Sequence, residues 1–488
     1  METTLDKRKF VPIVSTIAFA AFMVSLDSYI VNVSLPSIAT FFNVSMSRVT
    51  LVILAYMVSL TSTTLIFGKL TDRFGLKAIF LLGYVVFSIG SLLCGISAHL
   101  PMLVASRFLQ GIGGSMLIIA AYAIIPRQVP HEIRGWAFAR VSVVAAFGVT
   151  VGAPLGGLIT GYLSWHWVFL INIPIGIAAV IVGRRILPAD RPRETEEARP
   201  PFDILGALLS FLGIFAIVYA LNNGSEEGWA SPKIVAGLVV FAVSLLSFLV
   251  WEKRAPDPLL ALRLFRNARF DLMLIAGGLA FMVVAGNNLL LPFYLEIDRG
   301  LAPQRTGIVL MLYSIAIMIV GPKAGAASDR IKPAVLCTIA MGSAGTAFLF
   351  FALLLPHQSP WPAVIFLVWL GVSCGLFLSP NSNQVMSEAP AEDQGAASGL
   401  FNMVMRLSLV LGACILETVF SEVVPHGAGS LAASDTSSQT LNHGFALAYT
   451  LAAALCFVAM AVSLITATRA PGREATATAK DGSNLPAG

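Results

Sequence analysis

Gly68-Lys69-Leu70-Thr71-Asp72-Arg73-Phe74-Gly75 stands at the end of an apolar run, and a weaker copy, Gly325-Ala326-Ala327-Ser328-Asp329-Arg330, follows a later run. The apolar runs before these charged segments are long enough to cross a bilayer. A motif that recurs at the same end of a span, on the same side of the membrane, indicates parallel repeats of one helical bundle. We therefore predict an all-α integral membrane protein made of two related halves.

The composition points to lipid as the solvent for most of the surface. Of 488 residues, 57% are hydrophobic and 12% are charged, and the mean hydropathy is +0.83, whereas soluble proteins carry about 25% charged residues. The charges form islands between apolar runs, so the net charge of +5 indicates membrane topology rather than nucleic acid binding. Neither the cysteines nor the histidines have the spacing of a disulfide framework or a metal site, so we expect no metal.

Fourteen apolar segments of spanning length can be placed along the chain. They cover residues 11–33, 47–68, 78–97, 102–124, 137–162, 166–186, 203–222, 232–251, 270–293, 304–322, 334–355, 361–384, 395–420 and 443–467. The start, Lys7-Arg8-Lys9 before an apolar run, resembles a signal peptide. Cleavage after Ala20 would divide a run that continues to Val33, so we expect an uncleaved first helix.

The basic residues fix the predicted orientation. With the N-terminus in the cytoplasm, all but six of the 31 lysines and arginines lie on the inner side. Four lie outside (Arg48, Lys233, Arg299 and Arg305) and two lie within spans. This bias places both termini in the cytoplasm. We divide the chain into a six-helix bundle (1–187), an inserted two-helix hairpin with cytoplasmic linkers (188–269), a second six-helix bundle (270–468) and a disordered cytoplasmic tail (469–488).

Two ionisable residues inside spans carry the main functional prediction. Asp27 lies deep in the first span, where a carboxyl group held away from water can become neutral and so load and release a proton. A permanent structural pair with a buried cation is the alternative. Arg107, in the fourth span beside Gln110, keeps its charge and needs an anionic or carbonyl partner. We expect it to control the protonation of Asp27, directly or through water, or else to tether backbone carbonyls.

Other polar residues in spans are weaker candidates. Arg406 and Glu417 are eleven residues apart in the thirteenth span, which puts them on one helix face about 16 Å apart. They are a possible second ionisable site, although Glu417 lies near the outer end and can simply meet interfacial water. Asn287, Asn288 and Tyr294 lie in the outer half of the ninth span. With Asn32 and Gln110 they form our predicted substrate cavity; ordinary hydrogen bonds between helices are the alternative.

The fifth span has small residues at regular spacing. Gly148, Gly152 and Gly156 recur every four residues, Gly157 follows, and Pro154 lies within the run. This pattern permits close helix contact and a bend, and tight packing alone also explains it. No Walker-type loop, zinc-protease motif or nucleophile elbow is present, so we expect no enzyme and no cofactor. The energy for transport would then come from an ion gradient, or else the transport is passive.

Together these segments resemble the major facilitator superfamily, and within it the fourteen-helix drug:proton antiporters of the EmrB/QacA type. Residues 68–77 are similar to the loop signature between the second and third helices, 26–36 to the first-helix motif, 107–114 to the fourth-helix motif, and 148–157 to the antiporter motif. Residues 165–176 and the inserted pair beginning Phe202-Asp203-Ile204-Leu205-Gly206 are typical of the fourteen-helix branch. The match extends to about Thr468.

The resemblance implies two six-helix bundles with a central cavity that opens alternately to each side. It implies that Gly68, Asp72, Arg73, Gly75 and Lys77 form a cytoplasmic gate loop. Asp27 and Arg107 would belong to the coupling machinery, and the fifth-helix glycines would seal against the opposite bundle. Three positions depart from the motifs: Tyr29 stands where threonine is usual, Leu76 replaces a basic residue, and Pro154 comes one position late.

We therefore predict a proton-coupled antiporter that exports small hydrophobic or amphipathic compounds from the cell, as a multi-pass protein of the cytoplasmic membrane that functions as a monomer. Its partners would be the substrate, protons and the bilayer. The alternative keeps the fold and exports one endogenous lipid, siderophore, antibiotic or metabolite. A membrane sensor or membrane enzyme would need a soluble signalling domain or a catalytic constellation, and the sequence contains neither.

Overall fold

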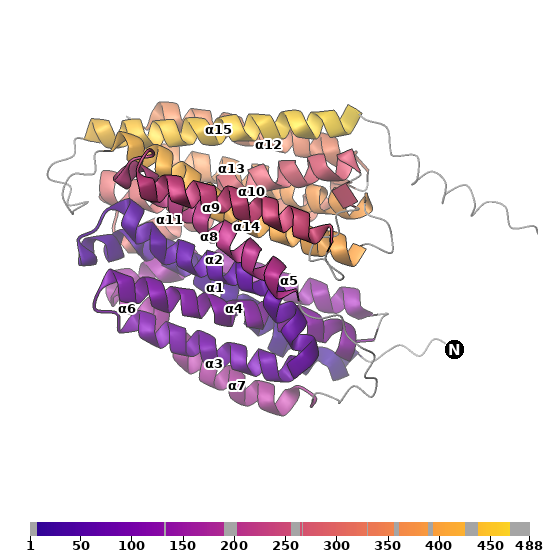
Figure 1. Ribbon diagram of the computed structural model, residues 1–488. Coiled ribbons are helices and arrows are strands. Elements are labelled where there is room, and N and C mark those ends of the chain that lie inside the picture. Colours follow the sequence, from indigo (N-terminus) through magenta and orange to yellow (C-terminus); the bar gives the residue numbers. More distant parts are fainter. Residues whose placement is uncertain are drawn as a thin grey trace, which may run out of the picture. The chain divides into compact units, whose positions relative to one another are not determined.

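The computed structural model describes residues 7–130, 133–189, 203–254, 264–265, 267–328, 330–355, 361–388, 394–424 and 438–468. Within these ranges the regular secondary structure is entirely helical (Figure 1). Fourteen helical segments are long and apolar enough to cross a membrane, which confirms the predicted number of spans. The predicted tail at 469–488 lies outside the described residues.

The helices follow the order of the predicted spans. Before the hairpin come η1 (Lys7–Phe10), α1 (Val11–Phe42), α2 (Met46–Phe74), α3 (Leu76–Gly95), α4 (Leu100–Gln128), α5 (Arg134–Tyr162), α6 (Trp165–Leu170) and α7 (Asn172–Ile186). The hairpin is α8 (Ile204–Glu227) and α9 (Pro232–Glu252). After it come α10 (Ala268–Phe293), the π-helical turn η4 (Tyr294–Asp298), α11 (Pro303–Ser328), α12 (Pro333–Leu354), α13 (Trp361–Ser387), α14 (Gln394–Val423) and α15 (Ser438–Thr468).

Several helices extend past their predicted ends, and α1 and α2 show the reason most clearly. α1 continues beyond residue 33 to Phe42, because the sequence stays apolar and Pro36 is accommodated inside the helix; it stops where Asn43 adopts a left-handed conformation, φ 52°. α2 continues through most of the predicted gate loop to Phe74. The connection to α3 is then the single residue Gly75, whose φ of 94° favours glycine.

The sixth span is broken into two helices. α6 ends at Leu170, Ile171 forms a one-residue turn, and α7 begins at Asn172. Pro174 supplies a physical reason, because it has no N–H to donate to the carbonyl four residues earlier. The sequence alone predicted one continuous span here. The break puts Asn172 at the start of a helix inside the membrane-crossing segment.

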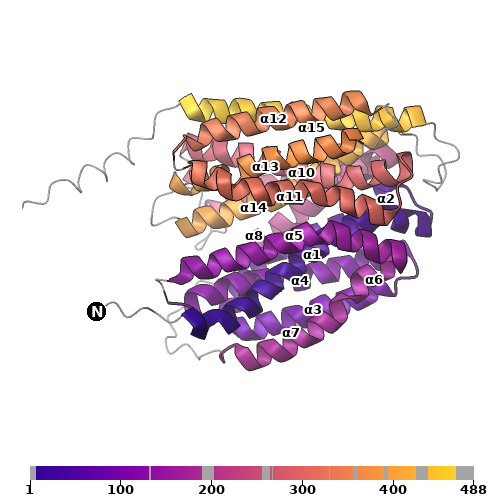
Figure 2. The same cartoon turned by 180° about the vertical axis from the view of Figure 1, so that it is seen from behind.

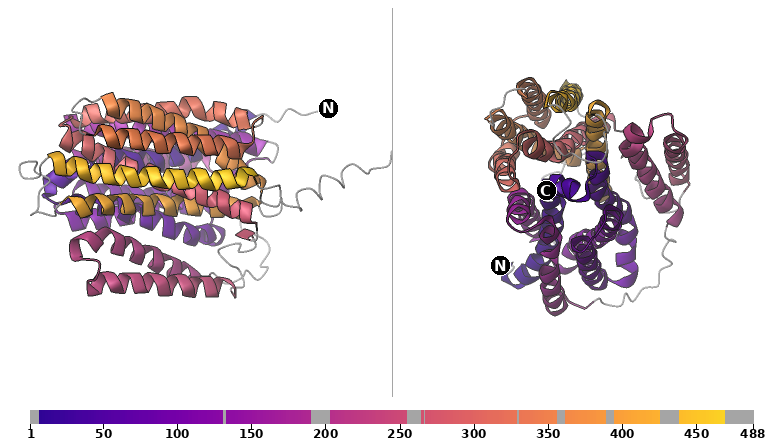
Figure 3. Two further views of the ribbon diagram at one scale, coloured as in Figure 1. Left: turned by 90° about the horizontal axis from the view of Figure 1, so that it is seen from above. Right: turned by 90° about the vertical axis from the view of Figure 1, so that its left-hand side faces the viewer.

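The inserted hairpin is braced at its inner end by one carboxylate. Asp203 accepts a hydrogen bond from the Gly206 amide (2.8 Å), which caps α8, and another from Trp251 Nε1 of α9 (2.7 Å). Ser231 caps α9 through the Ile234 amide. Figure 3 shows α8 and α9 side by side as a pair.

The small-residue face of α5 packs on α1, which lies beside it along much of its length (Figure 2). A Cβ atom at Gly148 would lie 2.6 Å from the Phe22 carbonyl oxygen, one at Gly152 would lie 2.9 Å from Tyr29 Cβ, and one at Gly156 would collide with the Ile30 carbonyl oxygen. Gly157 faces α11 instead, where a Cβ would collide with the Pro303 carbonyl oxygen. The predicted glycine face is thus shared, since three of these glycines contact α1 and Gly157 contacts α11.

Gly156→Ala is expected to destabilise the protein. The new methyl group meets main-chain atoms of α1 that cannot rotate away, so we expect a loss of about 1–3 kcal/mol, measured as thermal stability in detergent. Gly321→Ala in α11 is the matched control, because a Cβ there meets no atom within 4 Å. A helical alanine in open space should leave stability unchanged or slightly raised. Equal stability of the two variants would contradict close packing of α5 on α1.

The contacts divide the chain into two compact units. Unit 1 comprises Met1–Leu259, Asn287–Ser314 and Ala413–Phe445, and unit 2 comprises Leu260–Gly286, Ile315–Gly412 and Ala446–Gly488. Unit 1 therefore contains, besides the first half and the hairpin, chain segments from the second half that the positive-inside bias places toward the outer side. Unit 2 has its own core, in which Phe351 stacks on Phe366, and a half-buried ion pair between Arg269 and Glu388 at 2.9 Å.

Candidate functional site

The polar centre of unit 1 is built around Asp27. This residue is fully buried in α1 and accepts three hydrogen bonds, two from α4 and one from α7. Arg107 Nη1 of α4 donates to Oδ2 at 2.6 Å, and Oδ1 accepts from Gln110 Nε2 and from Asn172 Nδ2, both at 2.9 Å. A carboxylate is an acceptor only, and all three of these groups donate to it.

Arg107 is held on several sides at once. Its side chain is 1% exposed, and besides Asp27 it donates from Nε to the Val52 carbonyl oxygen of α2 at 3.2 Å. The guanidinium lies over the Tyr56 ring, 4.1 Å from the centroid, and within 5.6 Å of the Phe169 ring. The structure thus places Arg107 in direct contact with Asp27 and with a backbone carbonyl, and its control of Asp27 protonation stays a prediction.

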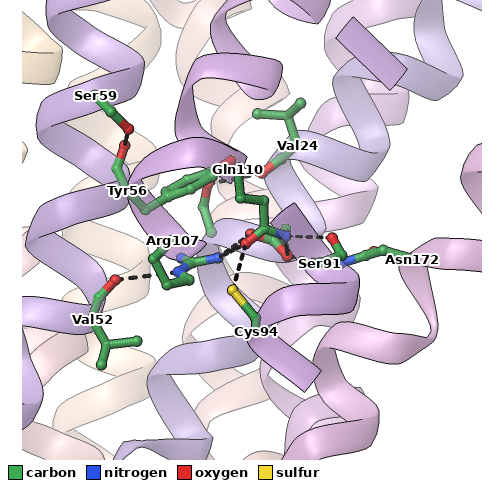
Figure 4. Close-up of polar contacts among 11 residues, drawn as sticks. Val24, Val52, Tyr56, Ser59, Ser91, Cys94, Arg107, Gln110 and Asn172 are labelled. Carbon is green, nitrogen blue, oxygen red and sulfur yellow. Dashed lines mark hydrogen bonds and ion pairs between the residues drawn. The ribbon is translucent and has the colours of Figure 1, made fainter. Parts of the chain in front are cut away.

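Gln110 links the pair to α3. Its Oε1 accepts from Arg107 Nη1 at 2.7 Å, and because a guanidinium only donates, this contact fixes which way the amide points. The Nε2 group then faces Asp27 and Ser91 Oγ, the latter at 2.7 Å. Cys94 Sγ donates to the same Oε1 at 3.8 Å. Figure 4 shows these side chains converging from several helices.

Burial makes this arrangement costly to disturb. Asp27, Arg107, Gln110, Asn172, Ser91 and Cys94 are all buried. A buried ion pair gains its stability from the match of charges and donors, and removing one partner leaves the other without compensation. A proton that neutralises Asp27 would have that effect on Arg107. The site can therefore couple protonation of one carboxyl group to the arrangement of α1, α3, α4 and α7.

Sequence reasoning found Asp27, Arg107 and Gln110 and missed Asn172, Ser91 and Tyr56. Asn172 belongs to the 165–176 motif that the resemblance singled out, although nothing there gave it a role. An amide near a proline inside an apolar span was the available signal. The contacts of Ser91 and Tyr56 depend on how helices distant in sequence pack, which single-sequence spacing does not specify.

The predicted substrate-cavity residues have different surroundings. Asn32 and Asn287 are buried, and the Oδ1 atom of each has no hydrogen-bond partner among the described residues. Tyr294 lies in η4 rather than in the helix before it; its hydroxyl accepts from Arg299 Nε at 2.8 Å and its ring packs on Phe445. Asn288 is half-buried. Gln110 belongs to the Asp27 cluster.

The possible second ionisable site is divided between the units. Glu417 is fully buried near the outer end of α14, where its Oε1 accepts from Ser421 Oγ at 2.5 Å. Arg406 is half-buried on the same helix but belongs to unit 2. A shared role for the two stays a prediction.

The gate-loop residues are described in part. Gly68, Asp72 and Arg73 lie in the helical backbone of α2, and their side chains are outside the described part of the chain. Lys77 donates from Nζ to the carbonyl oxygens of Arg184 (2.9 Å) and Leu187 (2.6 Å), at the end of α7. The start of α3 is thereby fixed to the end of the sixth span.

A multi-pass membrane protein with fourteen crossing helices, a buried ion pair and glycine-packed helices has the architecture of a solute transporter. The chain belongs to the Major Facilitator Superfamily, whose model matches residues 17–413. This agrees with the family resemblance of the sequence motifs. The family consists of transporters rather than enzymes.

The relatives of this chain differ in the roles that their names give. The chain is 30% identical to the riboflavin transporter RibZ of Clostridioides difficile, over 94% of this chain and 97% of that protein. It is 28% identical to the multidrug resistance protein Stp of Mycobacterium tuberculosis, over 86% and 77%. It is 32% identical to the putative multidrug resistance protein MdtD of Escherichia coli, over 82% and 84%.

The fold also resembles solved structures. A bacterial homologue of the human lysosomal transporter Spinster aligns with a TM-score of 0.67 at 14% identity, over 96% of this chain and all of the other. This likeness supports the helical architecture alone.

Proposed function

We propose that the protein exports small hydrophobic or amphipathic compounds from the cytoplasm in exchange for external protons, by alternating access across the cytoplasmic membrane. The observation that carries the proposal is the buried Asp27–Arg107 pair with its amide donors. An ionisable residue in a membrane span is costly and by default functional. The similarity to the multidrug resistance proteins Stp and MdtD supports drugs as the kind of cargo.

Coupling follows from the alternation of the cluster between two charge states. External protonation of Asp27 removes the negative charge that pairs with Arg107 and turns one acceptor oxygen of the carboxyl group into a donor, which favours substrate release outward and return to the inward-facing state. There Asp27 loses its proton and substrate binds again. A ligand that prefers one state shifts the population toward it. Each charge moved is worth about 2.3 kcal/mol per 100 mV of membrane potential, so one or two protons drive moderate accumulation. In this scheme the protein works as a monomer without a cofactor.

A second candidate is a dedicated carrier of one metabolite. The riboflavin transporter matches nearly the whole length of both chains, including the hairpin region. Flavins are amphipathic aromatic molecules, so the buried amides Asn32 and Asn287, each with a free acceptor oxygen, could select such a cargo by hydrogen bonds. The coupling machinery would be the same in both cases.

Transport into proteoliposomes under an imposed pH gradient separates the candidates. The panel contains lipophilic cations, neutral drugs and riboflavin, and substrate-driven proton movement is recorded with a pH-sensitive dye. Proton movement with several unrelated compounds supports drug antiport, and movement with riboflavin alone supports the dedicated carrier. If the uptake of every compound were independent of the pH gradient, the result would overturn proton coupling.

Asn172→Leu is expected to change the pH dependence of transport. The variant removes one of the three hydrogen-bond donors to the Asp27 carboxylate, the group that exchanges the proton in this scheme. The charged or titratable groups of the cluster are Asp27, Arg107, Tyr56 and Cys94, and all remain. The transport rate, recorded over a series of internal pH values, should follow a profile different from that of the wild type.

Asn223→Leu is the matched control for this experiment, because Asn223 Nδ2 donates within its own helix to the Tyr219 carbonyl oxygen. Its pH profile should match that of the wild type. A uniform loss in Asn172→Leu at every pH would indicate a purely structural amide and would contradict its role in positioning the carboxylate.

A further inference from the structure

The inserted hairpin is hydrogen-bonded to helices from both halves of the sequence, and all of these bonds lie at its outer end. On the first-half side, Ser47 Oγ of α2 donates to the Asn222 carbonyl oxygen at 2.7 Å, and Asn222 Nδ2 donates back to the Ser47 carbonyl oxygen at 3.3 Å. Both residues are buried. The Phe211 ring of α8 also contacts the Phe108 ring of α4, with 6.1 Å between centroids.

The bonds on the second-half side are of a different kind. Thr418 Oγ1 of α14 donates to the Leu221 carbonyl oxygen at 2.8 Å, and the same hydroxyl lies 2.8 Å from the Cys414 carbonyl oxygen of its own helix. One proton is shared between two acceptors. Trp229 Nε1 donates to Glu422 Oε1 at 2.6 Å, and this pair is exposed.

The two sides therefore differ in how easily they separate. Breaking the Ser47–Asn222 pair would leave buried polar groups without partners, which is costly. Breaking the contacts with α14 costs less free energy. The Thr418 hydroxyl keeps its hydrogen bond to the Cys414 carbonyl oxygen, and the exposed Trp229 and Glu422 side chains can hydrogen-bond to water instead. The rest of the hairpin offers little competing attachment, since α9 buries few residues and presents an apolar face to lipid.

We propose that the hairpin is a one-sided tie between α2 and α14. It stays bonded to α2 throughout the transport cycle, and it releases α14 when the outer ends of α2 and α14 separate. The tie stabilises the arrangement in which these outer ends are joined. The proposal rests on the proposed function, because only a transporter that alternates needs to separate them. It gives the inserted pair of helices a task that the two bundles do not perform.

Distances between spin labels test the tie. Cysteine labels replace exposed or half-buried residues at the outer ends of α2 (Arg48), the hairpin (Lys233) and α14 (Val424). Pairs of labels are measured in nanodiscs at acid and alkaline pH, with and without substrate. The five native cysteines are buried, and labelling of the unsubstituted protein measures their background.

The expected result is a constant Arg48–Lys233 distance together with a second, longer Lys233–Val424 population. A longer Arg48–Lys233 distance with a constant Lys233–Val424 distance would overturn the proposal, because the hairpin would then travel with α14. Constancy of all three distances, Arg48–Val424 included, would instead count against alternating access and so against the proposed function itself.

Thr418→Val tests the release step. Without the shared hydroxyl the tie to α14 weakens, so the fraction of molecules at the longer Lys233–Val424 distance should rise severalfold. Thr450→Val is the matched control, because Thr450 Oγ1 donates only within α15, to the Ala446 carbonyl oxygen. An unchanged distribution in Thr418→Val would overturn the tie.

Discussion

Asp27→Asn is expected to abolish substrate-driven proton movement while leaving substrate binding in place. Asparagine resembles the protonated carboxylic acid in shape and removes the charge, so Arg107 loses its ionic partner and no proton can be exchanged. In proteoliposomes, proton release on substrate addition should fall to the level of protein-free liposomes. Substrate binding, measured by fluorescence or calorimetry, should remain within about tenfold of the wild type, equivalent to 1.4 kcal/mol.

Asp203→Asn is the matched control. Asp203 is a buried carboxylate of the hairpin that caps α8 and accepts from Trp251, and asparagine can perform both tasks. This variant should transport normally. Full export by Asp27→Asn would contradict the assignment of Asp27 as the coupling group.

Arg107→Gln should reduce both stability and transport, by leaving the Asp27 carboxylate buried without its cation. Breaking a buried pair on one side costs about 3–5 kcal/mol, so we expect a strongly lowered thermal unfolding temperature in detergent. The double variant Asp27→Asn with Arg107→Gln removes both charges and should recover most of the stability, yet it should not recover proton-coupled transport. That separation distinguishes the structural part of the pair from its coupling part.

Arg48→Gln serves as the control for loss of a positive charge, because Arg48 is exposed at the start of α2. Its stability should equal that of the wild type. If the double variant were as unstable as Arg107→Gln alone, the cost would come from the lost Val52 and Tyr56 contacts of the guanidinium rather than from an unpaired carboxylate.

The fold could be predicted from the sequence because the length and hydropathy of each apolar segment identify it as a membrane span. The boundaries followed less well, since apolarity does not mark where a helix stops: α1 runs on until Asn43 turns left-handed, and α2 runs on until Gly75. The break before Asn172 was not predicted either, because the segment around Pro174 is apolar enough to be assigned to one continuous span. These helix ends and the break depend on the local backbone properties of Asn43, Gly75 and Pro174, which a hydropathy profile does not indicate.

Of the candidate site, only Asp27, Arg107 and Gln110 were predictable from the sequence. Asp27 and Arg107 stand out because charges are rare in spans, and the structure places them 2.6 Å apart. Asn172 and Ser91 are ordinary polar residues whose role depends on the packing of α3 and α7 around α4. The glycine face of α5 was visible in its spacing, but spacing cannot tell that Gly156 faces α1 and Gly157 faces α11.

The central claim is that the Asp27 carboxyl group changes its protonation state during transport. Infrared difference spectroscopy of the reconstituted protein, recorded as substrate is added near neutral pH, observes buried carboxyl groups directly. The account predicts a substrate-dependent carboxylic acid band in the wild type and in Asp203→Asn that is missing in Asp27→Asn. A carboxylate at Asp27 that stays ionised with and without substrate, in a protein that still transports against a pH gradient, would contradict it.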